Sequence, residues 1–235
     1  YGKRYFKITL VEYVFFSGGF DSTAFLLECL FVKKVETTPI VVTDPDLDGK
    51  KFHWTGRECL VFEEDARKKV YKFVEQQNDS IKNLLKPEIK IDKVVLTEPM
   101  ISTSKIAFDK GIFPRLYKQV HYFYQIMNDM GIKGNILGTR DDGTTQEVNK
   151  YADKEGYVDS SKLPDYLTFL GLFKVPYLHQ SKEEILERAV KYGYDSILYH
   201  TWSCWFPSGG QPCGKCEMCN GRIIECKVEI SKNFI

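Results

Sequence analysis

The sequence predicts an α/β fold in which helices flank a mostly parallel sheet, with a small cysteine-rich segment near the C-terminal end. Three observations predict it. Short apolar runs bounded by turn residues alternate with longer segments of helical periodicity, an order typical of parallel strands joined by crossover helices. A Ser-Gly-Gly turn at residues 17–19 separates the first apolar run from the first helical segment. Four of the seven cysteines lie within residues 204–219.

The expected strands are short and buried. Residues 10–16 form an apolar, β-branched and aromatic run, and residues 39–43 form a second run that ends at Asp-Pro-Asp. Lys-Val-Val-Leu-Thr at residues 93–97 predicts a third strand, and Asn-Ile-Leu at residues 135–137 predicts a fourth. In open parallel sheets, ligands bind at the carboxyl ends of the strands.

The expected helices lie between these strands. Helical spacing extends over residues 22–32, 57–77 and 115–130, and either Asp21 or Ser22 can cap the first helix. A later helix opens with the spacing of a capping box at residues 181–184. Residues 144–165 are polar and weakly periodic, which predicts a mobile loop over the carboxyl edge of the sheet. The apolar face of the second helix is expected at Ala66, Val70, Phe73 and Val74.

The composition of the whole chain limits the possible function classes. Its 235 residues suit one large domain with a small appendage, and we place the boundary between residues 1–200 and 201–235. A formal net charge of +1 gives no global electrostatic case for nucleic acid. No apolar run reaches the roughly 18 residues of a membrane span, and the N-terminal residues lack a secretory pattern. We expect a cytoplasmic protein, because an odd number of partly clustered cysteines suits a reducing compartment.

The cysteine cluster predicts a structural zinc site. Four thiolates at this spacing can surround one soft divalent ion, and a closed four-thiolate shell leaves no open position for water. Cys29 and Cys59 are expected to be small buried hydrophobic residues, and Cys226 is not expected to be a ligand. The predicted zinc ligands are Cys204, Cys213, Cys216 and Cys219.

The Ser-Gly-Gly-Phe-Asp-Ser-Thr string at residues 17–23 predicts a phosphate-binding loop, because it follows a strand and opens a helix. Two glycines allow the backbone to approach an anion, and the helix start adds N–H donors and partial positive charge. Ser17, Ser22 and Thr23 add hydroxyl groups, and Asp21 can hold a magnesium ion that bridges phosphates. A Walker loop is excluded, because it requires a Lys that this loop lacks.

The loop resembles the pyrophosphate-binding loop of the PP-loop ATP pyrophosphatase superfamily, which has an adenine nucleotide alpha hydrolase-like, Rossmann-like fold. Members of that superfamily cleave ATP between its α and β phosphates and adenylate a carboxylate, an amide or a tRNA base oxygen. Thr-Trp-Ser-Cys at residues 201–204 and Cys-Gly-Lys-Cys-x-x-Cys-x-x-Arg at residues 213–222 resemble one branch, the 7-cyano-7-deazaguanine synthase (QueC) family.

The resemblance implies an ATP-dependent ligase of queuosine biosynthesis that converts the carboxylate of 7-carboxy-7-deazaguanine into a nitrile with ammonia. Its partners would be small molecules, and a homodimer is expected by analogy with the family. A carboxylate is a poor electrophile because it lacks a good leaving group, and adenylation supplies one. Such an enzyme needs phosphate stabilisation and ammonia positioning rather than a covalent nucleophile.

The resemblance also implies roles for individual residues. Asp21, Ser22 and Lys182 would be catalytic, with Lys182 neutralising phosphate. Arg222 would contact the phosphates or brace the zinc loop. Adenosine and metal would be held where the second and fourth strands end. The expected nucleotide-binding residues are Ser17, Gly18, Gly19, Asp21, Ser22, Thr23, Thr43, Asp44, Gly138 and Arg222.

Two stretches depart from the family pattern. Strings of the Arg-Asn-Leu and Tyr-Pro-Asp-Cys-Arg types correspond here to Phe-Pro-Arg-Leu-Tyr at residues 113–117 and Asp-Asp-Gly-Thr-Thr at residues 141–145. A related ligase with another carboxylate acceptor, as in viral or antiviral branches, therefore stays open. The same is true of a tRNA-modifying PP-loop enzyme and of a zinc-bearing protein that binds nucleotide without catalysis.

Overall fold

The computed structural model describes residues 11–43, 57–92, 94–109, 117–137, 148–216 and 218–221. Within this part of the chain, no helix is both long enough and apolar enough to span a membrane. The strands are β1 (Val11–Phe15), β2 (Glu36–Val42), β3 (Ile89–Ile91), β4 (Gly134–Asn135) and β5 (Phe173–Lys174). The helical elements are α1 (Phe20–Glu28), the π-helical turn η1 (Cys29–Lys33), α2 (Arg57–Glu75), α3 (Asp79–Lys82), α4 (Glu98–Asp109), α5 (Tyr117–Met130), the 3-10 helices η2 (Ser160–Lys162) and η3 (Asp165–Leu172), α7 (Lys182–Tyr192) and α8 (Asp195–Leu198).

The described strand pairs are all parallel. β1 pairs with β2 along its whole length, and β2 pairs with β3 from Ile40 to Val42. β4 and β5 form a second parallel pair, and β4 lies beside β1. There the side-chain amide of Asn135 donates a hydrogen bond of 3.1 Å to the carbonyl oxygen of Tyr13. The predicted α/β class with a parallel sheet is confirmed.

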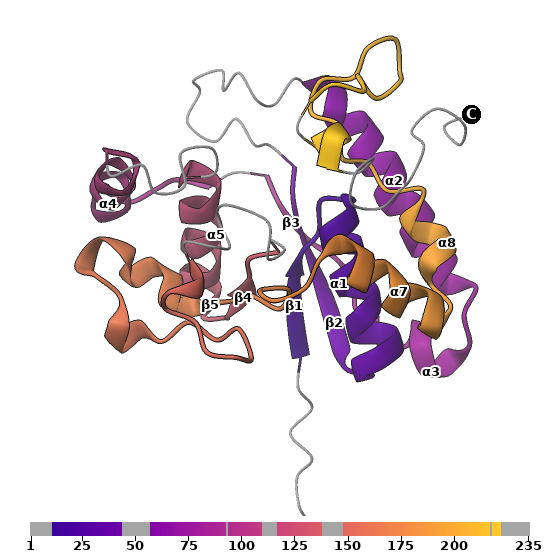
Figure 1. Ribbon diagram of the computed structural model, residues 1–235, viewed down its shortest axis with the longest axis horizontal. Helices are drawn as coiled ribbons and strands as arrows, with labels where there is room; N and C mark the ends of the chain where they lie inside the picture. Colours follow the sequence, from indigo (N-terminus) through magenta and orange to yellow (C-terminus); the bar gives the residue numbers. More distant parts are fainter. Residues whose placement is uncertain are drawn as a thin grey trace, which may run out of the picture.

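Helices cover both faces of this sheet (Figure 1). Successive side chains of a strand point to opposite faces, so each strand contributes to two cores. Val14 and Val41 belong to the core shared with α1, α2, α3, α7 and α8. Phe15 and Ile40 belong to the core shared with α4, α5 and η3. The same division is seen in Figure 1, where α4 and α5 lie on one side of β1 and α1, α2, α7 and α8 on the other.

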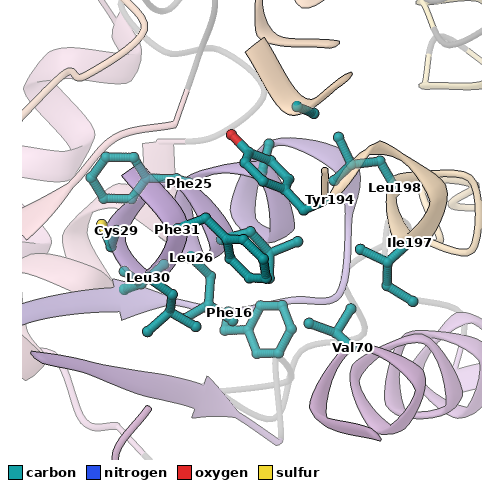
Figure 2. Close-up of a cluster of buried hydrophobic side chains, with 14 of the residues drawn as sticks. Phe16, Phe25, Leu26, Cys29, Leu30, Phe31, Val70, Tyr194, Ile197 and Leu198 are labelled. Atoms are coloured by element: carbon teal, nitrogen blue, oxygen red, sulfur yellow. The ribbon is translucent and has the colours of Figure 1, made fainter. Parts of the chain in front are cut away.

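The first of these cores is centred on α1 (Figure 2). Phe25 and Leu26 are fully buried there. Phe16 reaches them from the end of β1, and Val70 reaches them from α2. Tyr194 adds its ring from the turn before α8. Because α1 is packed on several sides, the position of the helix start, where the preceding loop ends, is fixed.

α1 begins earlier than the sequence predicted and ends differently. Gly19 is the residue that caps the helix, with an extended backbone, and Asp21 lies within the first turn. The prediction that Asp21 or Ser22 caps α1 is therefore wrong. The helix widens into the π-helical turn η1 and ends at Lys34, whose φ of 53° is left-handed. Cys29, the first residue of η1, is fully buried.

The third strand predicted over residues 93–97 is wrong. The strand that pairs with β2 is β3, immediately upstream, where Ile89 and Ile91 alternate with Lys90. Residues 94–97 form no strand and lead into α4, with the Ile101 N–H bonded to the Thr97 carbonyl oxygen. A short apolar run indicates burial, but it does not say which neighbour provides the burial.

The loop predicted over residues 144–165 is packed where the structure describes it. Residues 144–147 lie outside the described residues. Val148, Val158 and Leu163 are buried in the second core, so residues 148–165 are not a mobile loop. The backbone of this segment forms isolated β-bridges and a 3-10 turn instead of a long helix or strand. Such short elements leave little periodicity in the sequence, which explains the wrong prediction.

α7 begins as predicted, with a complete capping box between Ser181 and Glu184. The helix is fastened to α1 by Arg188, whose Nη1 atom donates to the Glu28 carboxylate at 2.6 Å. The other Arg188 nitrogen donates to the side chain of Gln180. These bonds join the middle of α7 to the C-terminal end of α1.

Replacing Leu26 by alanine should lower the free energy of unfolding by about 2–5 kcal/mol, because the change empties a fully buried position of the first core. Val61→Ala is the control, since Val61 is 67% exposed on α2 and its truncation should change stability by about 0.5 kcal/mol or less. Denaturant unfolding followed by circular dichroism measures both changes. A Leu26→Ala loss no larger than that of Val61→Ala would contradict the central position of α1.

Candidate functional site

The glycine loop of residues 17–23 joins the carboxyl end of β1 to the start of α1. Gly18 has a φ of +86°, which L side chains rarely adopt. The Gly19 N–H donates to Ser17 Oγ at 3.1 Å, and Ser17 Oγ lies 3.1 Å from Ser22 Oγ. The structure therefore brings the two predicted serine hydroxyls together at one helix N-terminus. Such a turn, with the positive end of a helix dipole behind it, suits an anionic ligand.

α2 closes one side of the loop. A Cβ atom on Gly18 would lie 2.6 Å from the Glu63 carbonyl oxygen and 3.1 Å from Cγ of Arg67. The Nη1 atom of Arg67 donates to the Ser17 carbonyl oxygen at 3.1 Å. Any side chain at Gly18 would push the loop away from α2, so glycine is required here for space as well as for backbone conformation.

Trp202 closes the other side of the loop. Its backbone N–H donates to the Gly18 carbonyl oxygen at 2.9 Å. Its carbonyl oxygen lies 3.4 Å from the position that a Cβ atom on Gly19 would take. The glycine loop is thus enclosed between α2 and the segment that carries the cysteines.

The four predicted zinc ligands come together. The Sγ atoms of Cys204, Cys213, Cys216 and Cys219 all lie within 4.8 Å of one another. The sulfur atoms of Cys216 and Cys219 are 3.4 Å apart, and those of Cys213 and Cys219 are 4.0 Å apart. Tetrahedral zinc with bonds of about 2.3 Å separates its sulfur ligands by about 3.8 Å. The donor set and its size therefore fit a tetrathiolate metal ion.

Backbone N–H groups point at the sulfur atoms of this cluster. The Cys213 N–H donates to Cys204 Sγ at 3.2 Å, and the Cys216 N–H donates to Cys213 Sγ at 3.3 Å. Burial acts to raise the pKa of the Cys213 thiol, but N–H donors from Lys215 and Cys216 bring that pKa below its ordinary value. Burial raises the pKa of the Cys204 and Cys219 thiols. A divalent cation would replace their protons, since thiolates are the metal-binding form.

The cluster rests on α2 through Trp202. The Trp202 ring stacks on Phe62 with ring centroids 4.3 Å apart, and its Nε1 atom donates to the Cys204 carbonyl oxygen at 2.8 Å. Ala66 is buried in the same small core as Trp202, Cys204 and Cys219. In Figure 1 the C-terminal segment, in yellow, lies against the upper end of α2. Cys29 and Cys59 are buried, as expected, and lie outside the four-sulfur group.

The other predicted nucleotide-binding residues are only partly described. Thr43 lies just after β2, where its hydroxyl donates to an Asp92 carboxylate oxygen at 2.5 Å. Thr23 is fully buried, and its N–H donates to the Gly19 carbonyl oxygen at 3.0 Å. Asp44, Gly138 and Arg222 lie outside the described residues, so their roles stay predictions.

Lys182 is the first residue of α7. It follows closely on Gln180, whose side chain accepts a hydrogen bond from Arg188. A catalytic role for Lys182 stays a prediction.

Sequence reasoning missed three residues that contact the loop, Glu63, Arg67 and Trp202. One signal was present: Glu63 and Arg67 occupy the helical stripe of Ala66 and Val70, where polar side chains need a polar neighbour. Trp202 lies two residues before the first cysteine of the cluster, but nothing in the sequence says that its backbone N–H is used by Gly18.

The fold and site together define a class of protein, a parallel α/β protein whose glycine loop at the first helix contacts a segment with a four-cysteine cluster. Residues 170–225 match the family model described as queuosine biosynthesis protein QueC. Two curated proteins named 7-cyano-7-deazaguanine synthase, from two strains of Leptospira biflexa serovar Patoc, are each 46% identical to this chain over 46 residues. These residues are 20% of this chain and 18% of the length of each curated relative. No solved structure matches the chain. The C-terminal part of the chain is therefore similar to the QueC family, and the chain spans less than a fifth of the length of the curated relatives it matches.

The purified protein should bind one Zn²⁺ per chain, and Co²⁺ in its place should give the visible absorption of tetrahedral cobalt–thiolate coordination. Cys216→Ser should abolish this absorption, because it removes one of the four ligands. Cys29→Ala, which changes a buried cysteine outside the cluster, should leave the stoichiometry and the spectrum unchanged. An unchanged cobalt spectrum in Cys216→Ser would mean that the described sulfur cluster is not the metal site.

The stability of the protein should depend on the protonation of Glu63. Burial raises the pKa of Glu63 to about 7 from its ordinary value of 4.5, and Arg67 offsets only part of the rise. Between these values the folded protein holds a proton that the unfolded chain has released, so the free energy of unfolding falls as the pH rises. Glu63→Gln cannot titrate and should therefore gain about 2–3 kcal/mol relative to the wild type from about pH 5 to about pH 8.

Denaturant melts of Glu63→Gln and wild type at these two pH values measure the gain. Glu64→Gln is the control, because the Lys68 hydrogen bond lowers the pKa of that exposed carboxyl and both of its pKa values lie below this pH range. Equal changes with pH in wild type and in Glu63→Gln would disprove the role of Glu63.

Proposed function

We propose that the protein is an ATP-dependent ligase that activates a carboxylate and joins it to ammonia. We further propose that this carboxylate is 7-carboxy-7-deazaguanine, giving the amide or the nitrile. One observation carries the proposal. Trp202 contacts both the glycine loop and the four-cysteine cluster, and the QueC family match includes Trp202 and all four cysteines. These contacts support a single site that includes both motifs.

The residues of the loop have the chemistry that polyphosphate binding requires. ATP with magnesium would supply the phosphoanhydride whose cleavage activates the carboxylate. Gly18 and Gly19 let the backbone come close to the phosphates, and the start of α1 favours their negative charge. Asp21, in the first turn of α1, would hold the magnesium ion. Ser17 and Ser22 would orient phosphate oxygens with their hydroxyl groups.

The carboxyl edge of the sheet is the proposed place of the adenosine and the acceptor. β1 and β2 end side by side, since the Phe16 N–H donates to the Ile40 carbonyl oxygen at 2.8 Å. Thr43 therefore lies on the same edge as the glycine loop. Asp44 and Gly138 lie outside the described residues, and their nucleotide-binding roles stay predictions. Ligands of open parallel sheets bind at such an edge.

The cysteine cluster would have a structural role in this enzyme. Four thiolates complete a tetrahedral shell, so the metal has no open position for water or substrate. The reaction itself would then depend on the loop, which binds the phosphates, and on ammonia, which needs to be positioned rather than activated. The proposed boundary at residue 200 would then separate the part that binds ATP from the part that braces it.

The activity should appear when the zinc-loaded protein is incubated with Mg-ATP, ammonium and 7-carboxy-7-deazaguanine, and mass spectrometry should detect AMP together with the amide or the nitrile. Asp21→Ala should lower the rate by about 100-fold or more, because it removes the proposed magnesium ligand. Asp79→Ala is the matched control, since Asp79 also lies in the first turn of a helix but is exposed on α3. It should keep the wild-type rate.

The outcomes separate the competing functions. ATP binding without conversion of the deazaguanine acid would exclude that acceptor and favour a ligase for another carboxylate. Tight tRNA binding with a steep salt dependence would favour a tRNA-modifying enzyme. Absence of AMP and of pyrophosphate with every carboxylate offered would exclude a ligase and favour a nucleotide-binding protein without catalysis.

A further inference from the structure

Trp202 determines the direction of a peptide group within the glycine loop. A trans peptide unit holds its C=O and its N–H in opposite directions. The C=O of Gly18 and the N–H of Gly19 belong to one such unit, and the Trp202 N–H binds that C=O at 2.9 Å. The Gly19 N–H is thereby turned toward Ser17 Oγ, which accepts it at 3.1 Å. Trp202 therefore sets the direction of one of the loop's N–H donors.

Arg67 does the same for the preceding peptide group. Its Nη1 atom binds the Ser17 carbonyl oxygen at 3.1 Å, and the N–H of Gly18 belongs to that same unit. The carbonyl oxygen of Gly19, the residue after Gly18, accepts a hydrogen bond of 3.0 Å from the Thr23 N–H within α1. Three consecutive carbonyl oxygens of the loop are thus bound by three different parts of the protein.

This outside support matters because both central residues are glycines. Glycine populates left-handed and right-handed backbone regions about equally, so the peptide group between Gly18 and Gly19 can reverse at little cost when nothing holds it. A reversed unit would present a carbonyl oxygen where an anion needs an N–H. The affinity of the loop for phosphate therefore depends on what holds Trp202.

Trp202 is held by the cysteine cluster and by Phe62. Only Ser203 separates it from Cys204, and its Nε1 atom donates to the Cys204 carbonyl oxygen at 2.8 Å. Its ring stacks on Phe62, with an angle of 17° between the planes. Trp202 is itself 5% exposed, in a core that includes Cys204 and Cys219. Without a metal, the cluster would lose the shell that fixes this core.

We infer that metal binding by the four cysteines orders the phosphate loop through Trp202, which makes Trp202 a positioning residue for the nucleotide. The inference rests on the proposed function in one respect, that the anion bound by the loop is the phosphate chain of ATP. Because coupling between two sites is reciprocal, ATP must also tighten the hold on the metal. The expected coupling is about 5-fold to 100-fold in either affinity.

The first test loosens Trp202 without touching the loop or the cysteines. Phe62→Ala removes the ring on which Trp202 stacks, and hydrogen–deuterium exchange of the zinc-loaded protein measures the amides of residues 17–23. These amides should exchange at least about 5-fold faster, and Mg-ATP should bind at least about 5-fold more weakly. Phe62→Tyr, which keeps an aromatic ring, should restore both values.

Phe73→Ala is the matched control. Phe73 also lies on α2 and stacks on an aromatic ring, that of Phe31 at 6.0 Å, but in the first core. It should leave the exchange of residues 17–23 unchanged even if it lowers overall stability. Equal effects of Phe62→Ala and Phe73→Ala on these amides, or no effect of either, would overturn the inference.

The second test measures the reciprocal effect. Zinc release from the wild-type protein to a chelator should slow by about 5-fold or more in the presence of Mg-ATP, and Phe62→Ala should remove the slowing. A protein that binds Mg-ATP without any change in zinc release would disprove the coupling. If the wild type binds no Mg-ATP, the proposed function fails, while the exchange experiment still decides whether Trp202 orders the loop.

Discussion

Gly18 lies so close to α2 that the backbone after β1 can follow only one path between the strand and α1. The carbonyl oxygen of Glu63 is 2.6 Å from where a Cβ atom would be, which sets the distance between the loop and the helix. α2 in turn carries Phe62 and Ala66, the surface on which Trp202 and the cysteines rest. The first core holds α1 behind the loop. The position of one glycine thus connects the strand, two helices and the metal-binding segment.

Features defined by local spacing were predictable from the sequence, and features defined by distant partners were not. The loop hydroxyls, the four cysteines and the capping box at Ser181 each depend on a few neighbouring residues. β3 depends instead on which segment reaches the free edge of β2, and two adjacent apolar runs compete for that place. Residues 148–165 are buried by α5 and η3, and their own pattern does not show it. The bond from Trp202 to Gly18 uses only backbone atoms, so no residue type signals it.

The negative charge of a metal-bound four-cysteine cluster must be offset if the neighbouring glycine loop is to bind phosphate. Four thiolates around a divalent ion carry a net charge of about −2, close to a loop that suits phosphate anions. The N–H groups that donate to Cys204 Sγ and Cys213 Sγ draw part of this charge away from the loop. The guanidinium of Arg67 also lies against the loop, where its Nη1 atom donates to the Ser17 carbonyl oxygen. A cation at this position offsets part of the negative charge that the cluster places near the loop.

The π-helical turn at the end of α1 changes which residues are neighbours on that helix. In a regular α-helix, residues five apart point about 140° away from each other, because each residue turns by about 100°. In the wider π turn they come to the same side, and Lys33 reaches the Glu28 carboxylate at 3.4 Å. Arg188 binds the same carboxylate from α7. In a regular helix the same pair would have to be four residues apart to share a face, so the π turn accommodates one additional residue between Glu28 and Lys33 without breaking their ion pair. The width of this turn is therefore as much a part of the interface between α1 and α7 as the charges that meet there.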